Sequence, residues 1–280
     1  TYPELDVASF HRYALTHEST MFDADGYLMI DEADRDGDGT TIQTVHGDRV
    51  LALDTRNGIL LVRVTGEGFN GVLAVVRDPA RVGLVVSAKK NVGQRIPVLC
   101  GDNNAILGIN ASGFVDDGGN GNGGRPYGYV VSNGEVRNRA EQGDWKVVGF
   151  DYDNILYTGS YKYLDRDLRD AAEFKPLLIN NGEIVVKVRD GWGINPRTAL
   201  GQTADGSVLM LIINGRSVSS LGCKSIEGAK ILAKYGAVQA SALDGGSSSV
   251  MYYNGRVITY PSGANKTDGR QLPNAFVVYK

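Results

Sequence analysis

Short runs of apolar and β-branched residues, separated by glycine, asparagine or aspartate, dominate this chain. Each run is bounded by turn-forming residues, which is the pattern of strands joined by hairpins. The predicted strands are 41–45, 49–54, 59–65, 72–77, 81–87, 105–109, 128–132, 146–150, 155–157, 177–179, 184–188, 198–203, 208–213, 236–243, 250–253, 256–258 and 275–279. Asn254-Gly255 supplies the two-residue turn that favours a tight hairpin between two of them.

Helical spacing of apolar residues occurs at three places: residues 8–18, 164–174 and 225–235. In the last of these, Gly236 is placed to end the helix. So few helices among so many strands predict an α+β fold, a mixed, sheet-dominated domain with few helices. We expect residues 1–95 to form a β-rich N-terminal segment packed on a main domain of residues 96–280.

The composition is that of a soluble globular protein with a sizeable core, since 42% of the 280 residues are hydrophobic. A formal net charge of −3 argues against a general polyanion-binding surface, so nucleic acid is not an expected partner. No apolar run is long enough to span a membrane. Cys100 and Cys223 define no disulfide framework, and two buried thiols are favoured over a bond between them.

The first candidate site follows the last long predicted strand. A carboxylate, Asp244, is followed there by two glycines and three serines. Glycine lets backbone N–H groups turn toward a ligand, and successive N–H groups with hydroxyls form an anion cradle. We therefore expect Asp244 to lie beside a phosphate or sugar site whose donors come from Gly245, Gly246, Ser247 and Ser248.

Two further polar segments adjoin predicted strands and supply the candidates Asn110, Ser112, Asn195, Arg197 and Thr198. A buried amide at a strand end, as expected for Asn110, orients a sugar or holds a catalytic loop. Pro196 restricts the residue before it to an extended backbone, so Arg197 is presented by a stiff segment. A planar guanidinium on such a support suits recognition of phosphate or carboxylate, and a surface ion pair is the alternative.

Two candidates are carried by weaker signals. A glycine- and asparagine-rich tract at 118–124 does not fit a dinucleotide-binding turn, but as a loop it brings Arg125 close in sequence to Asn110. Glu227 lies on the predicted helix that leads to Asp244, either as a second carboxylate or as a solvated helix-face charge.

An acidic run near the N-terminus is a candidate metal site. Asp34, Asp36 and Asp38 alternate and a glycine follows, as in the first half of a calcium loop. The twelfth position of such a loop would be Val45, where an EF-hand requires a glutamate. An acidic turn between strands is the alternative interpretation.

Three segments, in this order along the chain, resemble motifs of the phosphodiester glycosidase family. They are NASGF at 110–114, NPRTALG at 195–201 and DGGSSSVM at 244–251. The family patterns are Asn-Gly-Gly-Phe-Phe, Asn-Pro-Arg-Thr-Ala-Ile-Gly and Asp-Gly-Gly-Gly-Ser, so Ser247 stands where the family has its third glycine. The resemblance covers about residues 100–280, and the first motif is similar to that of bacterial and phage-associated members. We expect the three segments to converge at one end of one sheet.

The resemblance implies hydrolysis of a sugar-1-phosphodiester, similar to an N-acetylglucosamine-1-phosphodiester, at the anomeric C–O bond. The products are a sugar and a phosphomonoester, whose low pKa reduces the need for a general acid. On this hypothesis Asp244 is the nucleophile or base and Glu227 the reserve second carboxylate. Arg197, with Arg125, binds the phosphate.

Two alternatives remain open: a non-catalytic glycan-binding or adhesin module on the same scaffold, and a phosphodiesterase that cleaves the P–O bond. The lack of a His/Asp cluster argues against a two-metal site. No cofactor is required, and structural Ca²⁺ is a candidate only. The expected partner is a glycan or sugar-phosphodiester substrate. Resemblance to bacterial and phage-associated members implies a location outside the cell or at its surface. The sequence indicates no oligomeric state.

Overall fold

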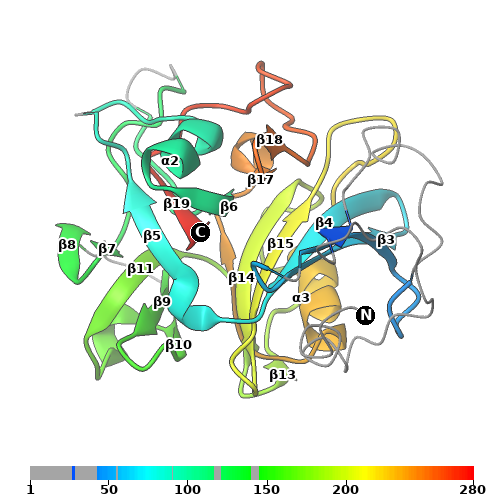
Figure 1. The fold of residues 1–280 in the computed structure, drawn as a ribbon. Coiled ribbons are helices and arrows are strands. Elements are labelled where there is room, and N and C mark those ends of the chain that lie inside the picture. Colours follow the sequence, from blue (N-terminus) through cyan, green and yellow to red (C-terminus); the bar gives the residue numbers. More distant parts are fainter. Residues whose placement is uncertain (1–26, 29–42, 55, 90, 117–120, 140–144) are drawn as a thin grey trace.

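The computed structural model describes residues 27–28, 43–54, 56–89, 91–116, 121–139 and 145–280 (Figure 1). This part of the chain forms three antiparallel sheets and two α-helices, so the predicted α+β, sheet-dominated class is confirmed. The helix predicted at 8–18 lies outside the described residues.

The largest sheet has nine strands within the described residues, and all its neighbouring strands are antiparallel. In spatial order they are β1 (Tyr27–Leu28), β2 (Arg49–Asp54), β3 (Ile59–Gly66), β4 (Phe69–Val76), β15 (Val208–Ile213), β14 (Arg197–Thr203), β16 (Ala237–Leu243), β12 (Leu177–Asn180) and β13 (Glu183–Ile184). The central strand β15 reads VLMLII and is buried throughout, because both faces of the sheet are covered. Strands β2 to β4 of the N-terminal region therefore share one sheet with β14 to β16.

Two five-stranded sheets complete the described fold. The first contains β10 (Leu156–Gly159), β9 (Lys146–Asp151), β11 (Leu168–Phe174), β7 (Val130–Ser132) and β8 (Glu135–Asn138). The second contains β18 (Arg256–Val257), β17 (Met251–Tyr253), β6 (Ala105–Asn110), β19 (Asn274–Tyr279) and β5 (Val82–Val86).

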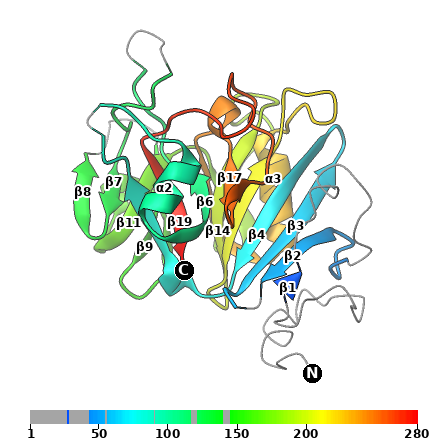
Figure 2. The same ribbon diagram turned by 45° about the horizontal axis from the view of Figure 1, so that its top comes forward.

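The main core lies where the three sheets meet. Leu61, Phe150 and Phe276 come from the three different sheets and are buried together there. A second core lies on the other face of the nine-stranded sheet, under α3 (Ser225–Lys234). The short helix α2 (Ile96–Asp102) covers the sheet that contains β6, as Figures 1 and 2 show.

Local sequence signals account for several element ends. Gly236 follows α3 with a φ of 82°, the left-handed conformation that ends a helix at the predicted place. Asn254 and Gly255 have φ values of 43° and 92°, as the tight turn between β17 and β18 requires.

The predicted helix at 164–174 is wrong, because residues 168–174 form strand β11. Every residue of β11 except Arg169 is buried, so its apolar residues do not alternate with polar ones, and Leu168, Ala171 and Ala172 fall at helical spacing. Glu173, only 1% exposed, accepts the backbone N–H of Tyr129 at 2.7 Å. Contacts of this kind between distant parts of the chain cannot be recognised from the local sequence pattern.

Three smaller differences concern short elements. The strand predicted at 184–188 ends at Ile184, and Val188 beyond it is 63% exposed. The described part of 41–45 forms a turn closed by an isolated bridge between Gln43 and Arg49. Helix α2 was not predicted, since its seven residues are too few to show helical periodicity.

Candidate active site

The three predicted segments meet at the seam between two sheets. Strands β14 and β16 are antiparallel neighbours, so Thr198 at the start of one pairs with Leu243 at the end of the other. Strand β6 belongs to a different sheet and reaches the same point, where Ala111 O accepts the N–H of Asp244 at 2.9 Å. The segments thus converge, but in two sheets instead of the one expected, because β17 and β19 flank β6.

Asn110 ties this seam together from inside the protein. Its side chain is fully buried and donates to Asp244 O at 2.5 Å. Its Oδ1 accepts from Thr198 Oγ1 at 2.8 Å and from Val250 N at 3.2 Å. Every polar atom of the amide is therefore used to hold the strand ends in register, which makes Asn110 a positioning residue.

Ser112 is also buried behind the surface. Its N–H and hydroxyl lie 2.9 and 3.1 Å from Asn274 Oδ1, and neither residue lines the cavity described next. Ser112, Asn110 and Thr198 thus support the site from below instead of facing its ligand.

In front of the seam lies an open cavity of about 500 Å³. Of the predicted site residues, it contains Asn195, Arg197, Asp244, Gly245, Gly246, Ser247 and Ser248. The remaining lining residues were not among the predicted site residues: Gly113, Phe114, Asp116, Tyr127, Trp145, Phe174, Trp192, Arg216 and Arg270. Its volume lies within the usual range for small-molecule sites.

Asp244 is the carboxylate at the floor of this cavity. Burial raises its pKa to about 6, against the opposing effects of a hydrogen bond from Ser248, the positive charge of Arg270 and the N–H of Gly245. A carboxyl group with such a pKa exists in both protonation states near neutral pH, which suits a group that exchanges protons or attacks a substrate.

The backbone after Asp244 requires glycine at both of the next two positions. The N–H groups of these glycines bond to other protein atoms and are therefore not available to a ligand. A Cβ on Gly245 would lie 2.8 Å from Pro196 O, and Gly246 has a φ of 63°. Gly245 N–H bonds the Asp244 carboxylate, and Gly246 N–H bonds Pro196 O at 3.0 Å. Among the described residues, no partner is found for the N–H of Ser247, which is thus the donor left for a ligand.

Arg197 contributes a positive charge to the same cavity. It is 8% exposed, and its Nε and Nη2 donate to Cys223 O and Gly193 O. Within the described residues, Nη1 has no hydrogen-bond partner, and no carboxylate lies within ion-pair distance of the guanidinium. Burial lowers the pKa of Arg197, because a charged group loses solvation inside the protein. An anionic ligand would supply the missing counter-charge.

A second arginine, Arg216, lies across the mouth of the cavity. Its Nη1 and Nη2 donate to Ser247 Oγ and Asn195 Oδ1, both at 3.2 Å. Ser247, which stands in place of the family's glycine, therefore contacts an arginine. Arg216 could have been predicted from the sequence. It follows the predicted strand 208–213, and antiparallel pairing places the end of that strand beside Arg197.

A third arginine and an aromatic wall complete the lining. Arg270 lies over the Phe114 ring at 4.6 Å and 3.7 Å from Asp116. The wall contains Tyr127, Trp145, Phe174 and Trp192, whose successive ring centroids are 4.8, 5.2 and 5.8 Å apart. Phe174 is the last residue of β11, and Trp145 directly precedes β9. Scattered aromatics carry no sequence motif, so only the fold reveals the wall.

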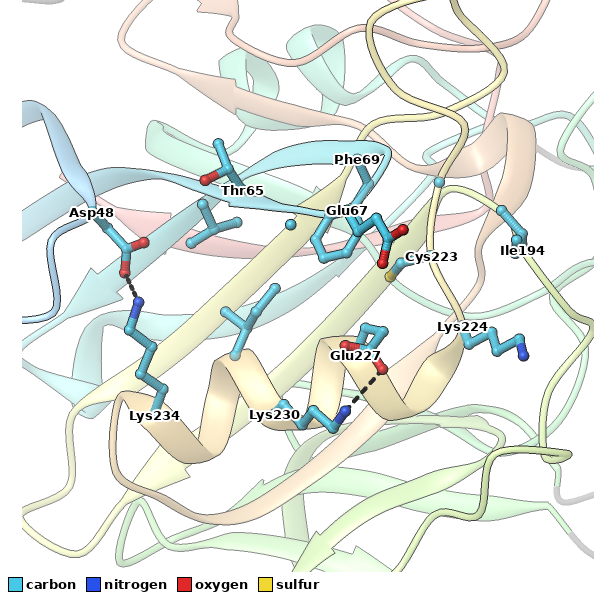
Figure 3. A pocket seen from close by; sticks show the side chains of 14 residues that line it. Asp48, Thr65, Glu67, Phe69, Ile194, Cys223, Lys224, Glu227, Lys230 and Lys234 are labelled. Carbon is cyan, nitrogen blue, oxygen red and sulfur yellow. Dashed lines mark hydrogen bonds and ion pairs between the residues drawn. The ribbon is translucent and has the colours of Figure 1, made fainter.

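The structure places Glu227 and Arg125 elsewhere. Glu227 lines a different cavity, of about 520 Å³, between α3 and the β3–β4 hairpin, where it pairs with Lys230 at 3.0 Å (Figure 3). Arg125 is exposed and does not line the Asp244 cavity. The second carboxylate of the Asp244 cavity is instead Asp116, and the further cations are Arg216 and Arg270.

The remaining sequence candidates concern thiols and metal ligands. Cys100 and Cys223 are buried free thiols, as favoured, and burial raises the pKa of each to about 12. Asp34, Asp36 and Asp38 lie outside the described residues. Within the residues that the structure describes, no three His, Cys, Asp or Glu side chains gather as a metal site would require. None of the described helices is long and apolar enough to cross a membrane.

Removing the Asn110 amide should cost stability at this seam. Asn110→Ala is expected to lower the free energy of unfolding by about 2–4 kcal/mol, because it leaves buried groups without their partner. Urea denaturation measures the change. Asn103→Ala removes a half-buried amide with a single bond to Leu99 O and is expected to cost less than about 1 kcal/mol. Equal losses in the two variants would refute the positioning role.

Comparison with known proteins identifies the family of this chain. A model of the phosphodiester glycosidase family matches residues 103–279, which include every residue lining the Asp244 cavity. A SPbeta prophage-derived uncharacterized protein of Bacillus subtilis, YomE, is 34% identical over 64 residues. That match covers 23% of this chain and only 10% of YomE.

Two solved structures share the fold at low identity. The zebrafish N-acetylglucosamine-1-phosphodiester alpha-N-acetylglucosaminidase catalytic domain, auto-inhibited by its pro-peptide, matches with a TM-score of 0.66 and 19% identity. The match covers 79% of this chain and 82% of that one. A hypothetical protein from Synechocystis matches with a TM-score of 0.58 and 16% identity, over 85% of this chain and 65% of that one. With the family match spanning most of the sequence, this chain belongs to the phosphodiester glycosidase family.

Proposed function

We propose that the protein hydrolyses a sugar-1-phosphodiester at the anomeric C–O bond, releasing a sugar and a phosphomonoester. The observation that carries this proposal is one cavity that contains both the carboxylate of Asp244 and the buried guanidinium of Arg197, for which the described residues provide no carboxylate partner. A sugar phosphodiester offers what both groups need, an anomeric carbon for the carboxylate and an anion for the cation.

The side chains that line the cavity have different roles in the proposed reaction. Asp244 either attacks the anomeric carbon, forming an intermediate that water then hydrolyses, or accepts a proton from the water that attacks this carbon. As the C–O bond breaks, its electron pair passes to the phosphate oxygen, and Nη1 of Arg197 stabilises the charge there. The sugar develops oxocarbenium character, and the aromatic wall offers its ring a stacking surface. Arg216, held by Ser247 and Asn195, adds a second cation.

The raised pKa of Asp244 predicts the pH dependence of this reaction. If the ionised carboxylate is required, kcat/KM should rise with pH through an apparent pKa of about 6 and level off above it. Below pH 6 the group is mostly protonated and cannot attack or accept a proton. A pH–rate profile of the purified protein measures this. An acid limb centred near pH 4, the usual value for an exposed aspartate, would contradict the assignment.

Hydrolysis in ¹⁸O-labelled water tests the function itself. The zebrafish relative's name suggests the probe, the methyl phosphodiester of α-N-acetylglucosamine-1-phosphate. We expect label in the released sugar, since water then attacks carbon. Label in the phosphate would establish P–O cleavage, and tight binding without any product would establish the glycan-binding module; either result overturns the proposal.

A further inference from the structure

A second cavity, of about 420 Å³, adjoins the Asp244 cavity. Trp192 lines both of them, and it is 57% exposed. The other lining residues are Lys146, Lys175, Pro176, Leu177, Val185, Asp190 and Gly191. The two cavities therefore form one continuous surface with Trp192 at their boundary.

Lys175 brings a positive charge to this boundary. Its Nζ lies 5.2 Å from the ring centroid of Trp145 and 5.8 Å from that of Trp192. The ion pairs of the described residues do not include Lys175, so two indole rings take the place of a carboxylate. Contact with ring faces leaves the ammonium able to attract an anion.

Charged and apolar side chains together line the second cavity. Among the described residues, its lining contains the lysines Lys146 and Lys175 and one carboxylate, Asp190, which accepts the N–H of Lys187 at 2.8 Å. Its apolar surface comes from Pro176, Leu177 and Val185. An aromatic ring, an aliphatic floor and ammonium groups together suit a sugar that carries a negative charge.

Contacts of the phosphate-site residues hold Trp192 in place. Asn195 Nδ2 donates to Trp192 O, and Arg197 Nη2 donates to Gly193 O one residue further along. The loop that separates the two cavities is thus fastened to the arginine proposed to bind the scissile phosphate.

We propose that the second cavity binds the neighbouring unit of a substrate that is a chain of sugars joined through phosphodiesters. This inference rests on the proposed function. One phosphodiester lies at Asp244 and Arg197. The next sugar ring lies against Trp192, and the next phosphate lies at Lys175. The preferred substrate is then a sugar-phosphate polymer, and a single sugar-1-phosphodiester occupies only half of the binding surface.

The test compares a one-unit probe with a three-unit probe. The first is the methyl phosphodiester of α-N-acetylglucosamine-1-phosphate, and the second is a trimer of N-acetylglucosamine units joined through 1-phosphodiesters. Calorimetry uses the Asp244→Asn protein, so that affinity is read without turnover. We expect the trimer to bind about tenfold more tightly than the single unit, as one added charged contact can provide.

Four further variants, each made in the Asp244→Asn background, show which residues cause the difference in affinity. Lys175→Met should reduce trimer affinity to that of the single unit, and Lys175→Arg should retain most of the advantage. Val185→Trp should also remove it, by filling the second cavity without changing charge. Lys162→Met, which removes an exposed lysine outside both cavities, is the matched control.

Equal affinities for the two probes, or a trimer advantage that survives both Lys175→Met and Val185→Trp, would overturn the second subsite. Failure of the proposed function looks different, because wild-type protein would then release no sugar from either probe. A trimer advantage that depends on Lys175 would support the subsite even in that case.

Discussion

Asp244→Asn is expected to lower kcat by about 10³-fold on a sugar-1-phosphodiester, while the protein remains folded. The substitution keeps the size of the side chain and an oxygen that can accept the Ser248 hydrogen bond. It removes the negative charge that attacks the anomeric carbon or accepts a proton. Steady-state kinetics with circular dichroism measures both properties. A folded variant that retains more than a tenth of wild-type kcat would exclude Asp244 from catalysis.

The same substitution should raise stability at alkaline pH. Folding raises the pKa of Asp244 to about 6, so the folded protein binds this proton more tightly than the unfolded chain does. The contribution of Asp244 to stability therefore falls as pH rises from about 4 to 6, and the whole penalty is present above 6. Asparagine carries no charge, so the Asp244→Asn protein does not lose this stability as the pH rises. Glu183→Gln, an exposed carboxylate on edge strand β13, serves as control and should change neither kcat nor stability.

Arg197→Lys is expected to lower kcat/KM by about 10²-fold, because a lysine cannot reproduce a fixed guanidinium. The present side chain is held by two carbonyl oxygens and keeps Nη1 for the substrate. An ammonium would point to those carbonyls or to the phosphate, but not to both. Arg197→Met should lose more activity, since it removes the charge altogether.

Inorganic phosphate provides a readout of Arg197 that does not depend on catalysis. An anion that binds only the folded state raises the thermal unfolding midpoint by mass action. We expect millimolar phosphate to stabilise the wild-type protein and to leave Arg197→Met unaffected. Arg137→Lys, which alters an exposed arginine paired with Glu135, should respond to phosphate as the wild type does. Phosphate stabilisation that persists in Arg197→Met would place the anion elsewhere.

The local pattern was most informative where local physics decides the structure. Asn254-Gly255 and Gly236 have the left-handed backbone that only a few residues adopt readily, so the hairpin and the end of α3 could be predicted. The run 208–213 is apolar throughout, which identified a buried strand. In residues 168–174, by contrast, burial of polar groups by distant partners produced a pattern that imitates a helix.

By itself, the sequence determined the sheet-dominated class and the segments that meet at the candidate site, with Asp244 and Arg197 among their residues. These features depend on short stretches of sequence, in which turn-forming residues and the ends of strands can be recognised without knowledge of the fold. Only the tertiary structure decided which of those residues face a ligand. In the folded protein, Asn110, Ser112 and Thr198 are buried behind the Asp244 cavity, and Glu227 lines a different cavity. Arg216, Arg270 and four aromatic rings also line the Asp244 cavity. The reason is that a cavity is lined by residues from many strand ends, and their common direction exists only once three sheets have packed together.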